Sequence, residues 1–492
     1  MSCGSTPPDG PIERRIHGDI SLTDATSAAA GVPADATVLT SGFGSVGYPK
    51  AVPLALAEDD RNLELTVVHS GNVGEEIDID LVASGAVDRR FSYQSSDVAR
   101  TATNRREIAF SDRNASAIGD EVQYGRLVDA DIAVVEAVAV GDGWFVPSTS
   151  VGQVPALVEA ADRLLIELNR QQPLELQELH DIYRPGTPPD RDPIPLSSPG
   201  ERIGASYVSF DPKKPVSVIE TDIPDSTYTF RDPTADDLAI AANLGSFLAA
   251  EIERSPVFED AVHLQFGVGS LGNALMGELK ELDFGDRDVV YFGELIQDGL
   301  FDMLDADRLK CASATSMALT DDGQERLFAD INRYAENIVL RPADVTNHPG
   351  LIDQFGVIGV NSAIEFDIYG NVNSTHAGGK RMINGVGGSA DFNRNSLVTV
   401  CALPSTLDGG DISRVVPMAF HIDHTEHDID VFVTEQGVAD VRGLSPVERA
   451  ELTIERCAHP DFEPDLRAYL EDVKQQNNHI PHDINRAIQW QE

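Results

Sequence analysis

Residues 289–304 read VVYFGELIQDGLFDML, and this stretch combines the features that decide the fold. The apolar run Val289–Phe292 is typical of a buried strand, and the residues that follow Gly293 and Glu294 are typical of a helix. A carboxylate at the carboxyl end of a parallel strand points into the crevice where α/β proteins bind ligands. Glu294 is therefore a candidate catalytic residue, although the helix dipole alone also favours a glutamate at a helix start.

Short apolar strands alternate with helical stretches, such as Pro49–Glu58, on both sides of this segment. The expected strands are Ala36–Thr40, Leu63–His69, Asp131–Val140, Leu164–Leu168, Val216–Glu220, His263–Phe266, Val289–Phe292, Val357–Val360 and Ile364–Tyr369. Such alternation predicts an α/β fold with largely parallel sheets covered by helices.

The length of 492 residues exceeds what one compact core supports, which favours two domains. Thr234, followed by Asp236 and Asp237, predicts a helix N-cap ahead of a long apolar run. We therefore expect domains at 1–230 and 231–492, with Glu294 in the second. Tyr183–Pro199 carries six prolines and predicts a surface loop. Ser445-Pro446-Val447-Glu448 predicts a capping box that starts a late helix.

The charge is strongly acidic, with 81 acidic and 37 basic residues and a net charge of −44. Such a surface repels nucleic acid and anionic membranes, and it repels itself at low ionic strength. We expect no nucleic-acid or membrane partner, and we interpret the acidic surface as an adaptation to a salty cytosol. No run in the sequence approaches the roughly 20 uninterrupted apolar residues that a membrane-spanning helix requires.

Export and disulfide formation are not indicated. The initial residues MSCGSTPPDGPIERR contain no apolar stretch typical of a signal sequence, so we expect a cytoplasmic location. The cysteines are far apart and form no C-x-x-C pair, which disfavours both a disulfide framework and a zinc knuckle. They are Cys3, Cys311, Cys401 and Cys457.

Two stretches fit the pattern G-x-G-x-x-G: Gly42–Gly47 and Gly267–Gly272. Glycines so spaced let a backbone and a helix N-terminus approach a phosphate, but they also form simple tight turns. A dinucleotide site needs an acidic residue about 20 positions further on, at the end of the next strand. Val67–Ser70 occupies that place after the first motif, so NAD binding is disfavoured there.

Other patterns predict less. The loop Asn384–Ser389 could supply backbone N–H donors to an oxyanion or could be a tight turn. His421, His424 and His427 suggest a metal site, but the strand expected at Val431–Thr434 would turn residues three apart to opposite faces. We therefore expect no metal. No G-x-S-x-G elbow supports serine hydrolase chemistry.

Several stretches together resemble the acetyl-CoA hydrolase/acetate (succinate) CoA-transferase family, within the class I CoA-transferases. The resemblance extends from about residue 18 to about residue 475 and is most specific in the last two stretches. They are SGFGSVGYPKAVP from Ser41, NRQQPLELQELHDIYRP from Asn169, GVGSLGNA from Gly267, GELIQDGL from Gly293, EFDIYGNVNSTHAGGKRMINGVGGSADFNRN from Glu365, and HIDHTEHDIDVFVTEQGVADVRGLSP from His421.

The resemblance implies two similar CoA-transferase domains with the active site between them, and a homodimer. Glu294 matches the family's nucleophile, which forms a glutamyl-CoA thioester, and Asn347 matches an asparagine that orients the acyl carbonyl. The implied CoA-binding loop is Gly269, Ser270, Leu271, Gly272 and Asn273, and the implied further CoA contacts are Asn384 and Gly388, the latter also an oxyanion donor. Relatives carry a different turn at His69-Ser70-Gly71-Asn72, where the carboxylate pocket is shaped.

The expected substrates are acyl-CoA and short carboxylates such as acetate or succinate, with no metal or bound organic cofactor. A carboxylate such as Glu294 can attack a thioester to give a mixed anhydride, which CoA thiolate then converts into an enzyme thioester. Transfer to a carboxylate is favoured because the thioester conserves energy that hydrolysis would waste. A hydrolase, a non-catalytic CoA- or nucleotide-binding module and a nicotinamide oxidoreductase remain as alternatives.

Overall fold

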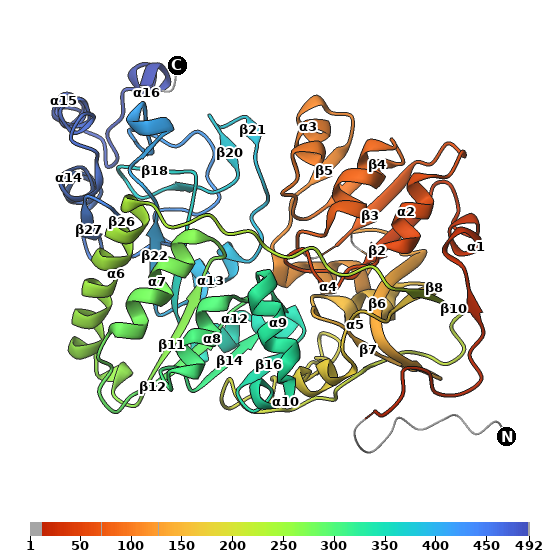
Figure 1. Cartoon of the computed structure of the whole chain (residues 1–492). Coiled ribbons are helices and arrows are strands. Elements are labelled where there is room, and N and C mark those ends of the chain that lie inside the picture. Colours follow the sequence, from red (N-terminus) through yellow and green to blue (C-terminus); the bar gives the residue numbers. More distant parts are fainter. Residues whose placement is uncertain (1–11, 70, 126, 491–492) are drawn as a thin grey trace. The chain divides into compact units, whose positions relative to one another are not determined.

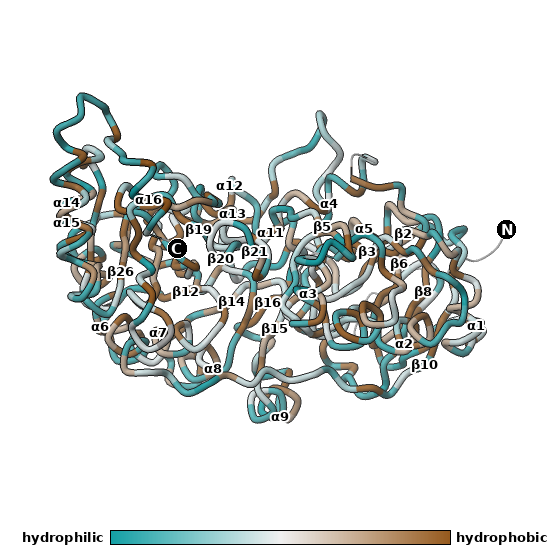
Figure 2. Tube along the Cα trace, turned by 90° about the horizontal axis from the view of Figure 1, so that it is seen from above, coloured by the Kyte–Doolittle hydropathy of each residue, from teal (hydrophilic) through white to brown (hydrophobic). Residues whose placement is uncertain are grey.

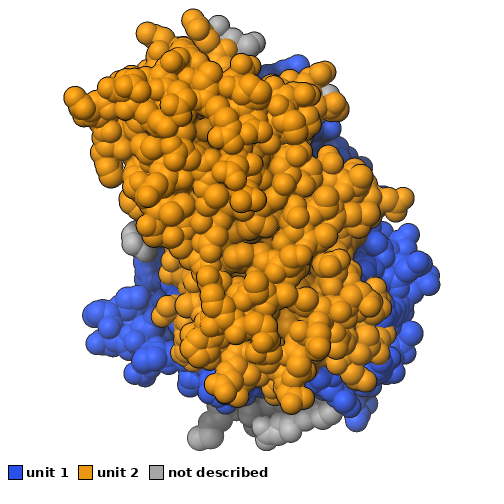
Figure 3. Space-filling view, turned by 90° about the vertical axis from the view of Figure 1, so that its left-hand side faces the viewer, with its two compact units in different colours: residues 1–229, 291–298, 311–351 blue, residues 230–290, 299–310, 352–492 orange. Residues whose placement is uncertain are grey.

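The computed structural model describes residues 12–69, 71–125 and 127–490, so Cys3 and Ser70 lie outside the described residues. The chain forms two compact units. Unit 1 contains residues 1–229, 291–298 and 311–351, and unit 2 contains residues 230–290, 299–310 and 352–492 (Figure 3).

Unit 1 is built on a ten-stranded sheet (Figure 1). Eight strands pair in parallel in the order β1-β10-β8-β6-β2-β3-β4-β5, while β7 pairs antiparallel with β6 and β9. Their bounds are β1 Leu22–Thr23, β2 Thr37–Thr40, β3 Leu65–Val68, β4 Val87–Phe91, β5 Ala109–Ser111, β6 Ile132–Gly141, β7 Trp144–Pro147, β8 Arg163–Asn169, β9 Val208–Ser209 and β10 Val216–Thr221.

Helices cover this sheet, and further short strands complete unit 1. The helical segments are α1 Ala25–Ala30, α2 Ala51–Ala57, η1 Glu76–Leu81, α3 Asp97–Arg105, α4 Ala115–Gln123, α5 Val154–Ala160, η2 Leu174–Leu179, α9 Asp321–Ala329, α10 Ile331–Tyr334 and α11 Ala343–Thr346. The additional strands are β13 Leu295–Ile296, β14 Cys311–Ala314, β15 Ser316–Met317 and β16 Ile338–Leu340.

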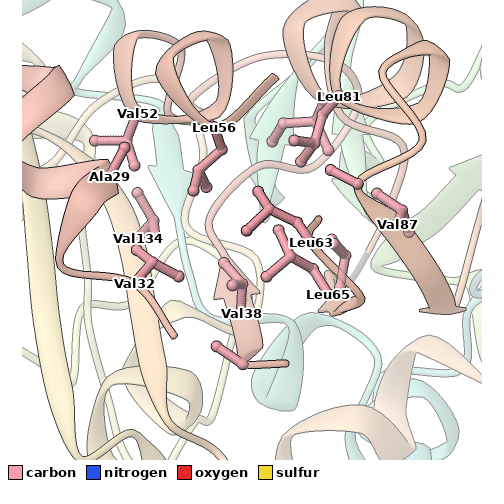
Figure 4. Close-up of a cluster of buried hydrophobic side chains, with 14 of the residues drawn as sticks. Ala29, Val32, Val38, Val52, Leu56, Leu63, Leu65, Leu81, Val87 and Val134 are labelled. Atoms are coloured by element: carbon pink, nitrogen blue, oxygen red, sulfur yellow. The ribbon is translucent and has the colours of Figure 1, made fainter. Parts of the chain in front are cut away.

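The core of unit 1 joins the sheet to the helices above it. Val38 and Leu65 of the sheet pack with Val52 and Leu56 of α2 and with Leu81 of η1 (Figure 4). All five side chains are buried. Burial of such a side chain contributes about 1.5–3 kcal/mol, so this cluster fixes α2, and with it the connection from β2, on the sheet.

Unit 2 contains a parallel array β11-β17-β22-β26 with β27 antiparallel at its edge. Its strands are β11 Ala261–Phe266, β17 Ile358–Asn361, β18 Glu365–Asp367, β19 Val372–Asn373, β20 His376–Ala377, β21 Arg381–Met382, β22 Val398–Ala402, β23 Thr406–Leu407, β24 Ile412–Ser413, β25 Val415–Val416, β26 Val431–Thr434 and β27 Gly437–Asp440. Its helical segments are α6 Ala235–Arg254, η3 Pro256–Phe258, α7 Ser270–Glu281, η4 Asp408–Gly410, α13 Ser389–Asn395, α14 Pro446–Cys457, α15 Glu463–Val473 and α16 Ile484–Trp490.

The core of unit 2 packs the late helices on the sheet. Phe366 and Phe432 lie with their ring centroids 4.4 Å apart, and Ile454 of α14 and Leu470 of α15 belong to the same buried cluster. The connection from α15 to α16, by contrast, is hydrophilic (Figure 2). Among the described helices, none has both the length and the apolar character that a bilayer crossing requires.

The sequence predictions of fold class and of the two helix starts are confirmed. Both units have largely parallel sheets with helices, and Thr234 and Ser445 each form a complete capping box. The domain boundary at 230/231 stays a prediction. The compact units divide the chain one residue earlier, between Thr229 and Phe230, and they also group 291–298 and 311–351 with unit 1. Three elements extend across the divisions between units: β12 Asp288–Phe292, α8 Asp298–Asp305 and α12 Pro349–Gln354.

Candidate active site

Glu294 lies in unit 1, on the short connection between β12 and β13. Its backbone carbonyl accepts hydrogen bonds from the N–H groups of Thr315, at 3.0 Å, and Ser316, at 3.1 Å. The next residue, Leu295, pairs with Ser316 in the parallel ladder of β13 and β15. These contacts fix the backbone on both sides of a carboxylate that is partly exposed.

The sequence prediction at this point is partly wrong. A helix was expected directly after Glu294, but the strand Leu295–Ile296 comes first, and α8 begins only at Asp298. Glu294 is therefore not a helix-start residue, and a helix dipole does not explain its position. Its segment belongs to compact unit 1, where Leu295 clusters with Phe43 and Ala318. The placement of Glu294 in a C-terminal domain stays a prediction.

Asn347 is the direct partner of the Glu294 side chain. Its Nδ2 donates a hydrogen bond of 2.9 Å to Oε1 of Glu294. The carboxamide is fully buried at the end of α11, and Thr346 Oγ1 donates to its Oδ1 at 2.9 Å. Because that oxygen is occupied, the amide N–H faces Glu294 and holds one carboxylate oxygen in place. The implied role of Asn347, to orient the acyl carbonyl, stays a prediction, and the contact with Glu294 places it next to the candidate nucleophile.

The first glycine loop, Gly42–Gly47, lies against the same segment. A Cβ added at Gly44 would stand 2.5 Å from Cδ2 of Leu295. The carbonyl of Phe43 accepts a 2.6 Å hydrogen bond from Ser316 Oγ. The loop therefore supports the segment that carries Glu294. No pattern in the sequence indicated this role, because Ser316 and Leu295 are distant from the loop along the chain.

The turn after β3 adjoins this loop, and the structure describes it except at Ser70. Asn72 Nδ2 donates to Ser45 Oγ at 2.6 Å and to the hydroxyl of Tyr228 at 3.1 Å. A cavity of about 300 Å³ is lined by Ser45, Val73 and Tyr228 among others. The cavity has room for a small organic group next to the loop that contacts Leu295.

The second glycine loop belongs to unit 2 and differs in its surroundings. Gly269 has φ 138° and is the N-cap of α7, which begins at Ser270. A Cβ at Gly269 would meet no heavy atom within 4 Å outside its own neighbours. Asn273 Oδ1 is buried, and no hydrogen-bond partner for it occurs in the described part of the chain. A helix N-terminus suits an anionic group, and an unsatisfied amide oxygen suits an N–H or O–H donor.

The third glycine loop, Asn384–Ser389, also belongs to unit 2. Gly388 is the N-cap of α13, and Ser389 Oγ donates to the carbonyl of Val386 at 2.7 Å. Asn384 Oδ1 resembles Asn273 Oδ1, since it is buried and unsatisfied as far as the described residues show.

Asparagine side chains connect the structures that carry these two loops. Asn361 at the end of β17 hydrogen-bonds Gln265 of β11, at 3.2–3.3 Å, and Asn393 of α13, at 2.9 Å. The strand before the second loop and the helix after the third are thus tied together within unit 2. The predicted residues accordingly fall into two groups: Glu294 and Asn347 in unit 1, and Gly269, Ser270, Leu271, Gly272, Asn273, Asn384 and Gly388 in unit 2.

The three histidines of the late motif have different surroundings. His424 is buried with Nε2 3.2 Å from Ser389 Oγ, and burial lowers its pKa to about 4. His421 Nε2 is 3.0 Å from Asp423, whereas the His427 side chain is 82% exposed. The expected strand Val431–Thr434 is confirmed as β26, but the three histidines precede it and lie outside any named strand. Within residues 12–69, 71–125 and 127–490, no three His, Cys, Asp or Glu side chains gather closely enough to hold a metal ion.

Two family models match the chain: the acetyl-CoA hydrolase/transferase N-terminal domain over residues 21–220 and the acetyl-CoA hydrolase/transferase C-terminal domain over residues 323–470. A succinyl-CoA:acetate CoA-transferase of Clostridium kluyveri is 39% identical over 92% of this chain and 85% of its own length. A propanoyl-CoA:succinate CoA transferase of Escherichia coli is 36% identical over 92% and 93%, and an acetyl-CoA hydrolase of Schizosaccharomyces pombe is 37% identical over 92% and 90%.

Solved structures share the fold. A mutant of RipA superposes with a TM-score of 0.73 at 20% identity, covering 92% of this chain and 98% of that one. A 4-hydroxybutyrate CoA-transferase of Porphyromonas gingivalis gives a TM-score of 0.62 at 20% identity, covering 92% and 97%.

Proposed function

Because the chain belongs to the acetyl-CoA hydrolase/transferase family, we propose that it transfers CoA between a short acyl-CoA, such as acetyl-CoA, and a carboxylate such as acetate or succinate. The observation that carries the proposal is the Glu294 carboxylate, partly exposed and held by Asn347 on a rigid connection. The relatives named as CoA-transferases at 36–39% identity support it.

The first half-reaction uses Glu294 as nucleophile. A carboxylate oxygen attacks the thioester carbonyl of acyl-CoA, and collapse of the tetrahedral intermediate breaks the C–S bond and releases CoA thiolate. The products at this stage are free CoA thiolate and a mixed anhydride between Glu294 and the acyl group. The thiolate then attacks the glutamyl carbonyl of the anhydride, which releases the first carboxylate and leaves a glutamyl-CoA thioester. Asn347 keeps the attacking carboxylate in one rotamer throughout.

The second half-reaction reverses these steps with a different carboxylate. The acceptor attacks the glutamyl thioester, thiolate leaves and returns to the acyl carbonyl of the new anhydride, and Glu294 is regenerated. Each tetrahedral intermediate carries an oxyanion, for which the backbone N–H of Gly388 is the proposed donor. One such donor contributes about 2.7–4 kcal/mol to transition-state stabilisation. No electron transfer occurs, and the protons balance without a further cofactor.

The two loops of unit 2 are the proposed CoA-binding elements. The N-terminus of α7, at Gly269 and Ser270, suits a phosphate, and the amide oxygens of Asn273 and Asn384 suit N–H or O–H donors of CoA. Leu271 and Gly272 complete the proposed loop. The cavity beside Ser45 and Tyr228 is the proposed place for a short acyl group.

We further propose a homodimer in a salt-rich cytoplasm, with no metal, nucleic-acid or membrane partner. The net charge of −44 supports the salt-rich setting and the absence of a nucleic-acid or anionic membrane partner, since such a surface needs counter-ions and repels polyanions. The homodimer and the absence of a metal rest on the family resemblance. Loss of activity on dialysis into dilute buffer, and recovery with added salt, is the expected result.

The decisive activity test compares acceptors in a high-salt buffer. CoA release from acetyl-CoA is measured without acceptor, and acyl transfer is measured with succinate, acetate or propionate present. The proposal expects transfer to be much faster than release to water. Equal rates with and without carboxylate would instead support the hydrolase activity for which the Schizosaccharomyces pombe relative is named.

A further inference from the structure

A cluster of buried charges lies beneath the first glycine loop in unit 1. Lys50 Nζ is 2.5 Å from Glu136 Oε2 and 2.8 Å from Asp225 Oδ1, and all three side chains have no solvent exposure. The ammonium group also donates to the carbonyl of Tyr48 at 2.8 Å. Buried ion pairs seldom stabilise a protein more than apolar side chains of the same volume would. Their presence here therefore calls for an explanation beyond stability.

Asp225 ties this cluster to the end of the loop. Its carboxylate accepts the backbone N–H of Gly47 at 3.1 and 3.2 Å, the hydroxyl of Thr149 at 2.7 Å and the amide of Gln172 at 2.8 Å. Lys50 supplies the positive charge that pairs with this buried carboxylate. The geometry makes Asp225 the acceptor that holds Gly47.

The loop needs such an external hold because its backbone is unusual. Gly42, Gly44, Ser45 and Gly47 have φ values of 117°, 69°, 59° and 64°. Positive φ at a residue with a side chain, such as Ser45, persists only where the surroundings impose it. The hydroxyl of Ser41, which donates to the carbonyl of Gly47 at 2.8 Å, adds a second hold at the same residue.

The other end of the loop supports the nucleophile segment. Gly44 lies so close to Leu295 that a Cβ would stand 2.5 Å from Cδ2, and Phe43 accepts the hydrogen bond of Ser316. Ser316 in turn donates its N–H to the carbonyl of Glu294. A continuous series of contacts thus leads from Asp225 through Gly47 and Gly44 to the backbone of Glu294.

We propose that Lys50 and Asp225 are positioning residues: they lock the loop Gly42–Gly47 in its strained conformation, and this loop places Glu294 for attack. The proposal rests on the assignment of Glu294 as nucleophile. It gives the first glycine motif a mechanical role in place of nucleotide binding. The chain itself fills the space on the Cβ side of the three glycines, since a Cβ at Gly42, Gly44 or Gly47 would have neighbours at 2.7, 2.5 and 2.6 Å.

The test compares two neutral substitutions around the same lysine. Asp225→Asn weakens the hold on Gly47 and leaves the Lys50–Glu136 pair, whereas the control Glu136→Gln leaves the Lys50–Asp225 pair and the contact with Gly47. We expect kcat of Asp225→Asn to fall roughly tenfold or more, with KM for acetyl-CoA nearly unchanged, because a small displacement of a reacting group is costly. Glu136→Gln should keep kcat within about threefold of wild type at a comparable loss of Tm.

The readout specific to positioning is the rate at which Glu294 acquires CoA in a single turnover, followed by intact mass. A slower rate in Asp225→Asn, but not in Glu136→Gln, is expected. Equal rates in wild type and Asp225→Asn would overturn the proposal, and so would equal losses of kcat in the two variants. Absence of any adduct in wild type would instead contradict the nucleophile assignment. If Asp225→Asn does not fold, Ser316→Ala interrupts the same series of contacts, and an unchanged kcat there overturns the proposal.

Discussion

The two G-x-G-x-x-G loops have the same pattern and opposite surroundings. Gly44 of the first loop would place a Cβ 2.5 Å from Leu295, whereas Gly269 of the second would place one in open space. The first loop is held by a buried carboxylate, and the second begins the twelve-residue helix α7. A glycine pattern therefore indicates close approach of the backbone, and the neighbours decide whether another part of the chain or a ligand approaches.

The two loops should therefore have different kinetic roles. The first supports the residue that performs the chemistry, so damage to it should lower kcat. The second has the properties of a ligand site, so damage to it should raise KM. These expectations can be separated with single substitutions that add one methyl group.

Gly44→Ala should have the largest effect. The methyl group would overlap Leu295 and displace the segment that carries Glu294, so we expect kcat to fall by roughly 100-fold with little change in KM. Gly85→Ala is the matched control, since Gly85 also has positive φ, 80°, but open space around it. Steady-state kinetics of both variants provides the measurement. A similar kcat in the two variants would show that the contact with Leu295 does not matter.

Asn347→Ala should have the next largest effect. It removes the 2.9 Å hydrogen bond to Glu294 Oε1 and so weakens the hold on that carboxylate. A hydrogen bond to a charged group contributes about 1.5–3 kcal/mol, which corresponds to a loss of kcat of roughly tenfold or more. Binding of CoA, measured by titration calorimetry, should stay unchanged. A rise in KM with normal kcat would assign Asn347 to substrate binding instead.

Gly269→Ala should act on binding. A side chain at φ 138° is strained by about 1–3 kcal/mol, and relief of this strain would move the N-terminus of α7. We expect KM for acetyl-CoA to rise several-fold while kcat stays near that of wild type. Gly410→Ala, at φ 107° in open space elsewhere in unit 2, controls for strain alone. If Gly269→Ala instead lowers kcat and leaves KM unchanged, the second loop does not act in substrate binding as proposed.

The stability of the folded chain should depend on pH through His424, which contacts Ser389 of the third loop. Burial lowers the pKa of His424 to about 4, below the usual value of 6.5. The unfolded chain therefore takes up a proton at His424 below about pH 6.5 while the folded chain does not, so stability is lost as pH falls toward 4. Between pH 6.5 and 5 the loss is up to about 2 kcal/mol. Denaturant unfolding of His424→Asn should lack this part of the loss, whereas the exposed control His427→Asn should retain it.

Local signals in the sequence predicted much of the fold. The capping residues Thr234 and Ser445 marked their helices, and the apolar run at Val289–Phe292 marked β12. The strand Leu295–Ile296 escaped prediction because two residues are too few to show a period of two. The contacts that support the first loop could not be predicted, because Asp225 and Ser316 are distant in sequence and reach the loop only in the folded structure.

The site was predicted unevenly for the same reason. Position after a strand marked Glu294 as a candidate, whereas Asn347 came only from the resemblance to a family. Its contact with Glu294 joins two segments that no local pattern relates. Lys50 lies inside the recognised stretch SGFGSVGYPKAVP, but a buried lysine cannot be told from an exposed one until its partners Glu136 and Asp225 are known.

The central claim, a covalent bond between Glu294 and CoA, is tested most directly by intact-protein mass. Wild type and Glu294→Ala are incubated with acetyl-CoA in high-salt buffer, reduced with borohydride and mapped by peptide mass. The predicted result is a CoA-sized adduct in wild type, with the reduced residue mapped to Glu294. Glu294→Ala should show neither the adduct nor the reduction. Steady release of CoA by folded wild type without any adduct at Glu294 would contradict the account, because water or acceptor would then attack the substrate directly.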